Sequence, residues 1–247
     1  MKKLTEPSSG KLGDKVSGKG RYGQYEHEHA PRTKPFSAAE RRAQERFGGA
    51  SSGWEDLVTP EQRKAWRREG AKVRSHPSGE GQSGPLTGQA FFTAINNNQA
   101  LIGLPPILDP PARPAFGPNP VGALSIREGR GGNTLKLSVP TAPAAHILVY
   151  GAAPCNAGRD YCDRFVYLGL LPAPRRGMSY ITELYVKKHG EPPAGKKVII
   201  WTLQQANGWR DVPKQNAKRT EAIVPGKPGA AGKPKRERAN VGRASRG

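Results

Sequence analysis

Apolar positions divide the chain into a helical part and a strand-rich part. Over residues 36–103 they recur every three or four positions, which is the period of an amphipathic helix. Over residues 121–212 they alternate with polar residues or form short runs between Gly- and Pro-rich turns, a pattern typical of antiparallel strands. Residues 104–120 are rich in proline, which favours an extended, semi-rigid chain. The pattern predicts an α+β protein with 104–120 as the linker between two small cores.

The helical segment carries three start signals. Ser37 and Glu40 have the spacing of a capping box, in which each side chain binds a free backbone N–H group of the other residue. Thr59 and Gln62 have the same spacing, and Thr87 precedes a third periodic stretch. The first helix is expected to stop at the two glycines after residue 47. About three helices are therefore expected, around a small core of Phe47, Trp54, Leu57, Trp66 and Phe91.

Short stretches between 121 and 212 have the length and pattern of strands. The candidates are 122–127, 134–139, 146–151, 164–170, 179–186 and 198–203. Residues 179–189 also fit a helix, because Ile181, Leu184, Tyr185 and Lys188 share a helical face. Short strands at regular spacing predict an antiparallel β-sandwich over 121–212.

The two ends of the chain are expected to lie outside these cores. Residues 1–35 are predicted to form a basic extended arm, in which 15–17 and 21–29 pair as a hairpin around a turn at 18–20. Residues 213–247 contain little apolar bulk, so we expect a disordered basic tail there.

The charge of the chain is strongly positive and uneven. Lys and Arg number 40 and Asp and Glu number 20, which gives a net charge of +20 over 247 residues. Residues 213–247 alone hold 10 basic and 2 acidic side chains. Such an excess favours an acidic macromolecular partner, either a protein assembly or a nucleic acid. The simpler alternative is a solvated, charged surface that keeps the protein in solution.

Basic residues that lie close together in the sequence are the candidate contacts to phosphates or acidic side chains. Three of them are expected on one face of the second helix. The candidates are Arg41, Arg42, Arg63, Lys64, Arg67, Arg68, Lys196, Lys197, Lys235, Arg236 and Arg238.

The sequence carries no pattern that predicts catalysis, a cofactor or a metal site. His27 and His29 would share one face of a strand, but no further Cys or His lies near them. Cys155 and Cys162 are expected to be free thiols in a reducing setting and are able to pair in an oxidising one. The Gly-rich stretch 129–132 lacks the Lys-Ser/Thr ending of a phosphate-binding loop. We therefore expect a protein that is not an enzyme.

Targeting signals are also missing from the sequence. The first residues are charged and lack the apolar region of a signal peptide, and no apolar stretch reaches the length of a membrane span. We therefore expect a protein of the cytoplasm or of an assembled particle. Assembly with copies of itself stays open.

Several short motifs are distributed along the chain. They are Ser9-Gly10-Lys11-Leu12-Gly13-Asp14, Arg21-Tyr22-Gly23-Gln24-Tyr25, Trp54-x-x-Leu57-x-Thr59-Pro60-Glu61-Gln62-Arg63-x-x-Trp66, Leu86-Thr87-Gly88-Gln89-x-Phe91-Phe92, Pro118-Asn119-Pro120, Pro193-Ala194-Gly195-Lys196-Lys197-Val198 and Asn207-Gly208-Trp209. These motifs resemble a family of uncharacterised bacterial proteins, some of them carried by prophages or other mobile elements. The resemblance covers about residues 4–225 and implies no established activity. Residues 121–212 also look like a fibronectin-type-III-like sandwich, a fold that hosts many roles.

A weaker similarity concerns DNA binding. The region 54–66 is similar to the last two helices of an HMG box and 86–96 to its first helix, in permuted order. An ordinary helical hairpin held by two tryptophans explains the same residues. Two functions follow as expectations. The first is a structural or interaction protein, associated with a phage-like particle, that binds an acidic partner through its basic ends. The alternative is non-specific nucleic-acid binding through helix 60–70 and the tail.

Overall fold

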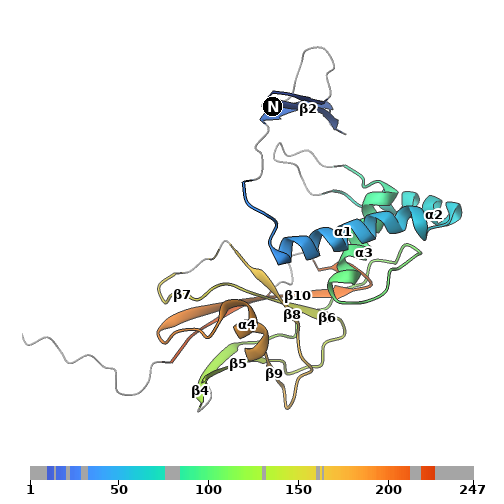
Figure 1. Ribbon diagram of the computed structural model, residues 1–247. Helices are drawn as coiled ribbons and strands as arrows, with labels where there is room; N and C mark the ends of the chain where they lie inside the picture. Colours follow the sequence, from blue (N-terminus) through green and yellow to red (C-terminus); the bar gives the residue numbers. More distant parts are fainter. Residues whose placement is uncertain are drawn as a thin grey trace, which may run out of the picture. The chain divides into compact units, whose positions relative to one another are not determined.

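The computed structural model describes residues 10–13, 15–20, 23–28, 33–75, 84–129, 132–159, 162, 164–211 and 218–225. The fold is mixed, with helices and several antiparallel sheets (Figure 1). The chain divides into two compact units, of which the first contains Met1–Pro114 and Ala206–Trp209. The second contains Ala115–Gln205 and Arg210–Gly247. The predicted combination of helices and antiparallel strands is confirmed at this level.

The first unit contains three helices, as predicted for this segment: α1 (Ala38–Asp56), α2 (Pro60–Gly70) and α3 (Gly88–Leu101). Both predicted capping boxes are present, since Ser37 and Thr59 accept from the third helical N–H and the Glu40 and Gln62 side chains accept from the cap N–H. The prediction that α1 ends near residue 47 is wrong. The helix continues past Gly48 and Gly49, and its later turns are buried at Ala50, Gly53 and Trp54, which offsets the low helix propensity of the glycines.

Aromatic side chains in edge-on and tilted contacts form the core of the first unit. Trp66 is fully buried, and its ring meets those of Phe91 and Phe92 edge-on, with centroids 5.1 and 5.3 Å apart. Trp54 packs against Phe92 at 5.7 Å. Two residues predicted for this core lie outside it, since Phe47 is 59% and Leu57 is 49% exposed. Val58 and Ile95 are buried there in addition.

Residues 104–114, in the predicted linker, belong to the first unit and have no regular structure. Side chains of the helices, and Trp209, bond to the backbone of these residues. The buried Asn96 both accepts from the Ile107 N–H at 2.7 Å and donates to the Ile107 carbonyl at 3.1 Å. Trp66 donates to the Leu108 carbonyl at 2.6 Å, and Trp209 donates to the Pro111 carbonyl at 3.1 Å. These bonds satisfy backbone groups that an extended proline-rich chain cannot pair with itself.

The N-terminal arm forms a three-stranded sheet in the order β1 (Gly10–Leu12), β2 (Lys15–Gly20), β3 (Gly23–Glu28). Gly20 pairs with Gly23, so the turn between β2 and β3 lies after Gly20. The predicted turn at 18–20 falls inside β2. His29 lies outside the described residues.

The second unit holds two antiparallel sheets. The larger has the order β11 (Trp209–Arg210), β10 (Lys196–Ala206), β6 (His146–Gly151), β8 (Val166–Leu170), with β12 (Lys218–Ile223) and β7 (Cys155–Asn156) also paired to β10. The smaller has the order β4 (Leu124–Gly129), β5 (Gly132–Ser138), β9 (Met178–Tyr180). The sheets share a core and form no barrel among the described residues. Its buried side chains include Leu135, Leu137, Ile147, Val149, Val198 and Ile200.

A fourth helix, α4 (Thr182–His189), replaces part of the predicted strand 179–186. Strand β9 ends at Tyr180, and α4 then lies against β5 and β8. Ile181 and Tyr185, four positions apart, are both fully buried, which fits the helical alternative for this stretch. The Tyr185 hydroxyl donates to the Ala152 carbonyl at 2.9 Å. Burial in the core therefore decided between two patterns that the sequence left open.

Candidate functional site

The predicted basic residues of α1 lie on its exposed first turns. Arg41 donates to the Phe36 carbonyl at 3.2 Å, and Arg42 donates to the Ala38 carbonyl at 3.2 Å. Neither forms an ion pair with a described carboxylate. Both guanidinium groups therefore keep their charge facing solvent.

On the basic face predicted for α2, Arg63 is engaged in contacts within the protein. Arg63 donates to the Glu55 carbonyl at 2.9 Å, lies 3.2 Å from the Glu55 carboxylate and stacks 5.8 Å above the Trp54 ring. Arg63 of α2 therefore contacts the end of α1 through these interactions. Lys64 is exposed.

The C-terminal half of α2 is partly neutralised as well. Arg68 lies 3.3 Å and Lys72 lies 2.8 Å from the Glu69 carboxylate. The hydrogen bond from Lys72 is the main cause that lowers the pKa of Glu69, and Arg68 adds to it. Arg67 is exposed, and its backbone packs against Gly88 so closely that a Cβ there would lie 2.8 Å from the Arg67 nitrogen.

The two lysines at the start of β10 have different surroundings. Lys196 donates to the Asn156 side chain at 2.7 Å. Lys197 is buried, with 7% exposed, and its ammonium lies 3.2 Å from the Glu221 carboxylate. Lys235, Arg236 and Arg238 lie outside the described residues. The predicted contacts thus divide between the two units, and Lys197 has a structural role.

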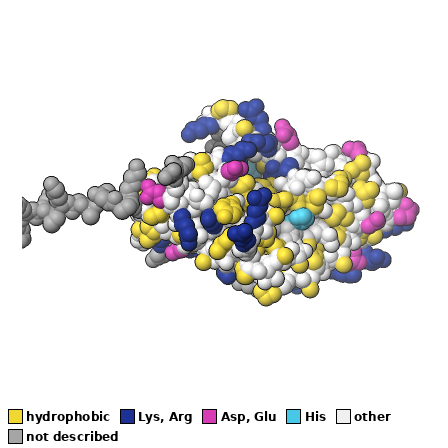
Figure 2. Space-filling view, turned by 90° about the horizontal axis from the view of Figure 1, so that it is seen from below, with side chains coloured by type: hydrophobic (Ala, Val, Ile, Leu, Met, Phe, Trp, Pro, Cys, Tyr) yellow, Lys and Arg dark blue, Asp and Glu magenta, His cyan; other side chains and the backbone are white. Residues whose placement is uncertain are grey.

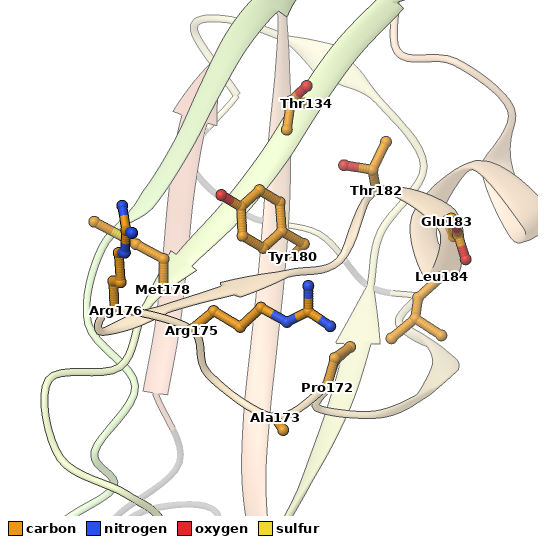
Figure 3. Close-up of a pocket in the computed structure, with 10 residues that line it drawn as sticks. All are labelled: Thr134, Pro172, Ala173, Arg175, Arg176, Met178, Tyr180, Thr182, Glu183 and Leu184. Carbon is orange, nitrogen blue, oxygen red and sulfur yellow. The ribbon is translucent and has the colours of Figure 1, made fainter.

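A different set of residues in the second unit lines an open hollow of about 940 Å³, which we call the arginine hollow (Figure 3). Strand β9, the loop that precedes it and the start of α4 form its walls. The lining residues are Thr134, Pro172, Ala173, Arg175, Arg176, Met178, Tyr180, Thr182, Glu183 and Leu184.

A two-residue hairpin turn presents the two arginines. Arg175 and Met178 exchange both backbone hydrogen bonds, at 2.7 and 3.0 Å. Arg176 and Gly177 lie between them with φ of +51° and +73°. Both arginines are exposed, and neither guanidinium has a hydrogen bond or an ion pair to a described residue. In Figure 3 the Arg175 side chain extends across the hollow toward Glu183 and Leu184 of α4, whereas Arg176 points the other way.

Polar contacts fix the walls around this turn. The buried Ser179 hydroxyl donates to the Pro172 carbonyl at 2.6 Å, which holds the loop against β9. Thr182 accepts from the Leu135 N–H at 2.9 Å, which attaches the start of α4 to β5. The Lys136 ammonium lies 4.8 Å from the centre of the Tyr180 ring, which is 49% exposed. The hollow therefore combines a rigid frame with exposed cations and one exposed aromatic ring.

Both cysteines interact electrostatically with Tyr185 of α4. They are free thiols and half-buried. Burial is the main cause that raises the pKa of Tyr185, and the negative charges of the Cys155 and Cys162 thiolates raise it further. Within the described ranges no group of three or more His, Cys, Asp or Glu side chains is placed to hold a metal ion. In the same ranges no helix has the length and apolar character needed to cross a membrane.

Comparison with known proteins gives no matching family model, no matching curated protein and no matching solved structure. The function therefore has to be inferred from the surface of the protein. On the face drawn in Figure 2, Lys and Arg side chains lie in several groups among hydrophobic and uncharged side chains.

Arg175 and Arg176 are not among the contacts predicted from the sequence. A signal was present, because two adjacent arginines precede a glycine between the predicted strands 164–170 and 179–186. The sequence did not show that the loop folds over β9 and leaves both guanidinium groups without a partner among the described residues.

Proposed function

We propose that this protein binds an acidic macromolecular partner through surface cations and that it acts as an interaction module, not as an enzyme. The observation that carries the proposal is the pair Arg175 and Arg176, which are exposed and unpaired among the described residues and line a hollow of about 940 Å³. Guanidinium groups bind carboxylates and phosphates through paired hydrogen bonds. The net charge of +20 adds a general attraction for polyanions.

The alternative, non-specific nucleic-acid binding through α2 and the tail, keeps some support. Lys64 and Arg67 remain exposed on α2, although Arg63 and Arg68 lie beside carboxylates. The fibronectin-type-III-like nature of residues 121–212 stays a prediction and adds to the picture of an interaction module.

The proposal is tested by titrating the full chain into fluorescein-labelled polyglutamate and following the anisotropy. We expect binding at about 50 mM salt that weakens roughly tenfold or more at about 300 mM salt, since exposed charge pairs are screened. A Gly/Ser polymer of equal length serves as the uncharged control. The absence of polyglutamate binding at the lower salt concentration contradicts the proposal. Tighter binding to duplex DNA than to polyglutamate favours the alternative.

A further inference from the structure

Two hairpin turns of this chain have the same backbone pattern but different sequences. At the turn between β10 and β11, Asn207 and Gly208 have φ of +49° and +74°. At the turn before β9, Arg176 and Gly177 have φ of +51° and +73°. Positive φ at both central residues belongs to a two-residue hairpin for which Asn-Gly is strongly preferred. Arginine is a poor choice for the first position, because its Cβ meets the backbone in the left-handed region.

Arg176 therefore occupies a position where the fold favours another residue. Its guanidinium has no hydrogen bond or ion pair to a described residue, so no contact in the described part of the chain offsets the backbone strain. Arg175, beside it, is exposed and equally without such a contact. Strain of this kind concentrates at binding sites, where the side chain contributes to function and not to stability.

One residue of the neighbouring strand directs its backbone groups away from the sheet. β9 is the last strand of its sheet. Ile181 donates to the Leu135 carbonyl at 3.1 Å. Because hydrogen-bond direction alternates along an antiparallel strand, the N–H and C=O of Tyr180 point away from β5. The backbone groups of Met178 are bonded to Arg175, so the preceding loop closes that end of the strand edge. Tyr180 thus offers two backbone hydrogen bonds to a peptide that enters the hollow.

We propose that the arginine hollow binds a short, extended peptide in which acidic and apolar side chains alternate; this inference rests on the proposed function. The carboxylates pair with Arg175 and Arg176, the peptide backbone pairs with Tyr180, and apolar side chains contact Met178 and Leu184. Successive side chains of an extended peptide lie on opposite faces, so carboxylates that reach the arginines alternate with apolar side chains.

A peptide suits the hollow better than a single-stranded nucleic acid does. Among the described residues that line the hollow, Tyr180 is the only aromatic one, and Lys136 lies over its ring at 4.8 Å. Nucleic-acid grooves of this type use several free aromatic faces on which successive bases stack.

The test compares two double variants of the full chain that remove the same charge. Arg175→Gln/Arg176→Asn alters the hollow, and Lys187→Gln/Lys188→Gln alters exposed lysines of α4 that do not line it. The probe is a labelled peptide of about ten residues in which Glu alternates with Val, measured by fluorescence anisotropy. We expect the hollow variant to lose about tenfold or more in affinity and the lysine variant less than about threefold. Thermal unfolding is expected to give a Tm for Arg176→Asn equal to or above that of the parent chain, since Asn suits the turn.

Two further probes separate the possible outcomes. A peptide of the same charge with Pro at alternate positions lacks N–H groups for β9, and we expect it to bind more weakly. Equal losses of peptide affinity in the two double variants, or no loss in the hollow variant, overturn the inference. If polyglutamate binding persists in that case, the proposed function still stands. The inference is also overturned if a single-stranded oligonucleotide of equal charge binds more tightly than the peptide and loses affinity in the hollow variant.

Discussion

The indole nitrogen of Trp66 donates a 2.6 Å hydrogen bond to the carbonyl oxygen of Leu108, which attaches the proline-rich segment to the helices of the first unit. The Trp66 ring is fully buried between Phe91 and Phe92. One side chain therefore joins the aromatic core to a stretch that has no secondary structure of its own.

The first prediction concerns this bond. Trp66→Phe leaves the Leu108 carbonyl without its donor, whereas Trp54→Phe removes a similar ring whose N–H bonds to no described residue. We expect Trp66→Phe to lower the free energy of unfolding by about 1–2 kcal/mol more than Trp54→Phe does. Urea unfolding followed by far-UV circular dichroism measures both. Equal losses would show that the hydrogen bond contributes little beyond ring burial.

A second prediction uses two glycines with the same backbone conformation, Gly208 and Gly195, both at φ +74°. A Cβ at Gly208 would lie 2.5 Å from the Ile95 side chain and 2.7 Å from the Ile95 carbonyl oxygen, whereas none of the atoms compared comes within 4 Å at Gly195. Gly195→Ala is expected to cost about 1–2 kcal/mol from the left-handed backbone alone. Gly208→Ala is expected to cost at least about 2 kcal/mol more, because the Ile95 backbone has to move. Similar unfolding midpoints for the two variants contradict the prediction that the Ile95 backbone leaves no room for a Cβ at Gly208.

The third prediction concerns the buried ammonium of Lys197 and its partner Glu221. Glu221→Gln removes the carboxylate 3.2 Å away and leaves a charge in a site that is 7% exposed. We expect a loss of about 1–2 kcal/mol, moderated by the partial exposure of Glu221, and a partial recovery in Lys197→Met/Glu221→Gln. Chemical denaturation of the two single variants and the double variant gives the coupling. As a control, Glu69→Gln, on the surface of α2, is expected to change the unfolding midpoint little. A double variant no more stable than Glu221→Gln refutes the account.

The fourth prediction concerns alkaline pH. Burial, aided by the two thiolates, raises the pKa of Tyr185 in the folded protein above its ordinary value of 10.0. Above about pH 10 the unfolded chain loses this proton while the folded chain keeps it, so stability falls with rising pH by up to about 1.4 kcal/mol per pH unit. Below that pH both states are protonated and the group adds no pH dependence.

The check compares the parent chain with Tyr185→Phe in urea titrations at about pH 9 and pH 11. Phe has no titrating hydroxyl, so its stability is expected to fall less between the two pH values. The variant also loses the bond to the Ala152 carbonyl, which lowers its stability at both pH values alike. Identical pH slopes would mean that Tyr185 ionises normally in the folded protein.

Local rules explain which parts of the fold were predictable. The capping boxes at Ser37 and Thr59 act within one helical turn, so their positions in the sequence suffice to place the starts of α1 and α2. The end of α1 was not predictable in this way, because burial of its later turns, which pack on α3, offsets the low helix propensity of its glycines. The stretch that became β9 and α4 fitted both periods, and burial of Ile181 and Tyr185 selected the helix.

The candidate site shows the same division. Charge is a property of composition, so the excess of cations and the expectation of an acidic partner follow from residue counts alone. Whether a given cation is available depends on neighbours distant in sequence. Glu55 lies beside Arg63 and Glu221 lies beside Lys197, whereas Arg175 and Arg176 remain unpaired among the described residues. The amino-acid sequence alone therefore determined the helix starts, the strand pattern and the net charge. Tertiary contacts decided which charges pair, because oppositely charged side chains that are distant in sequence meet only when the chain has folded.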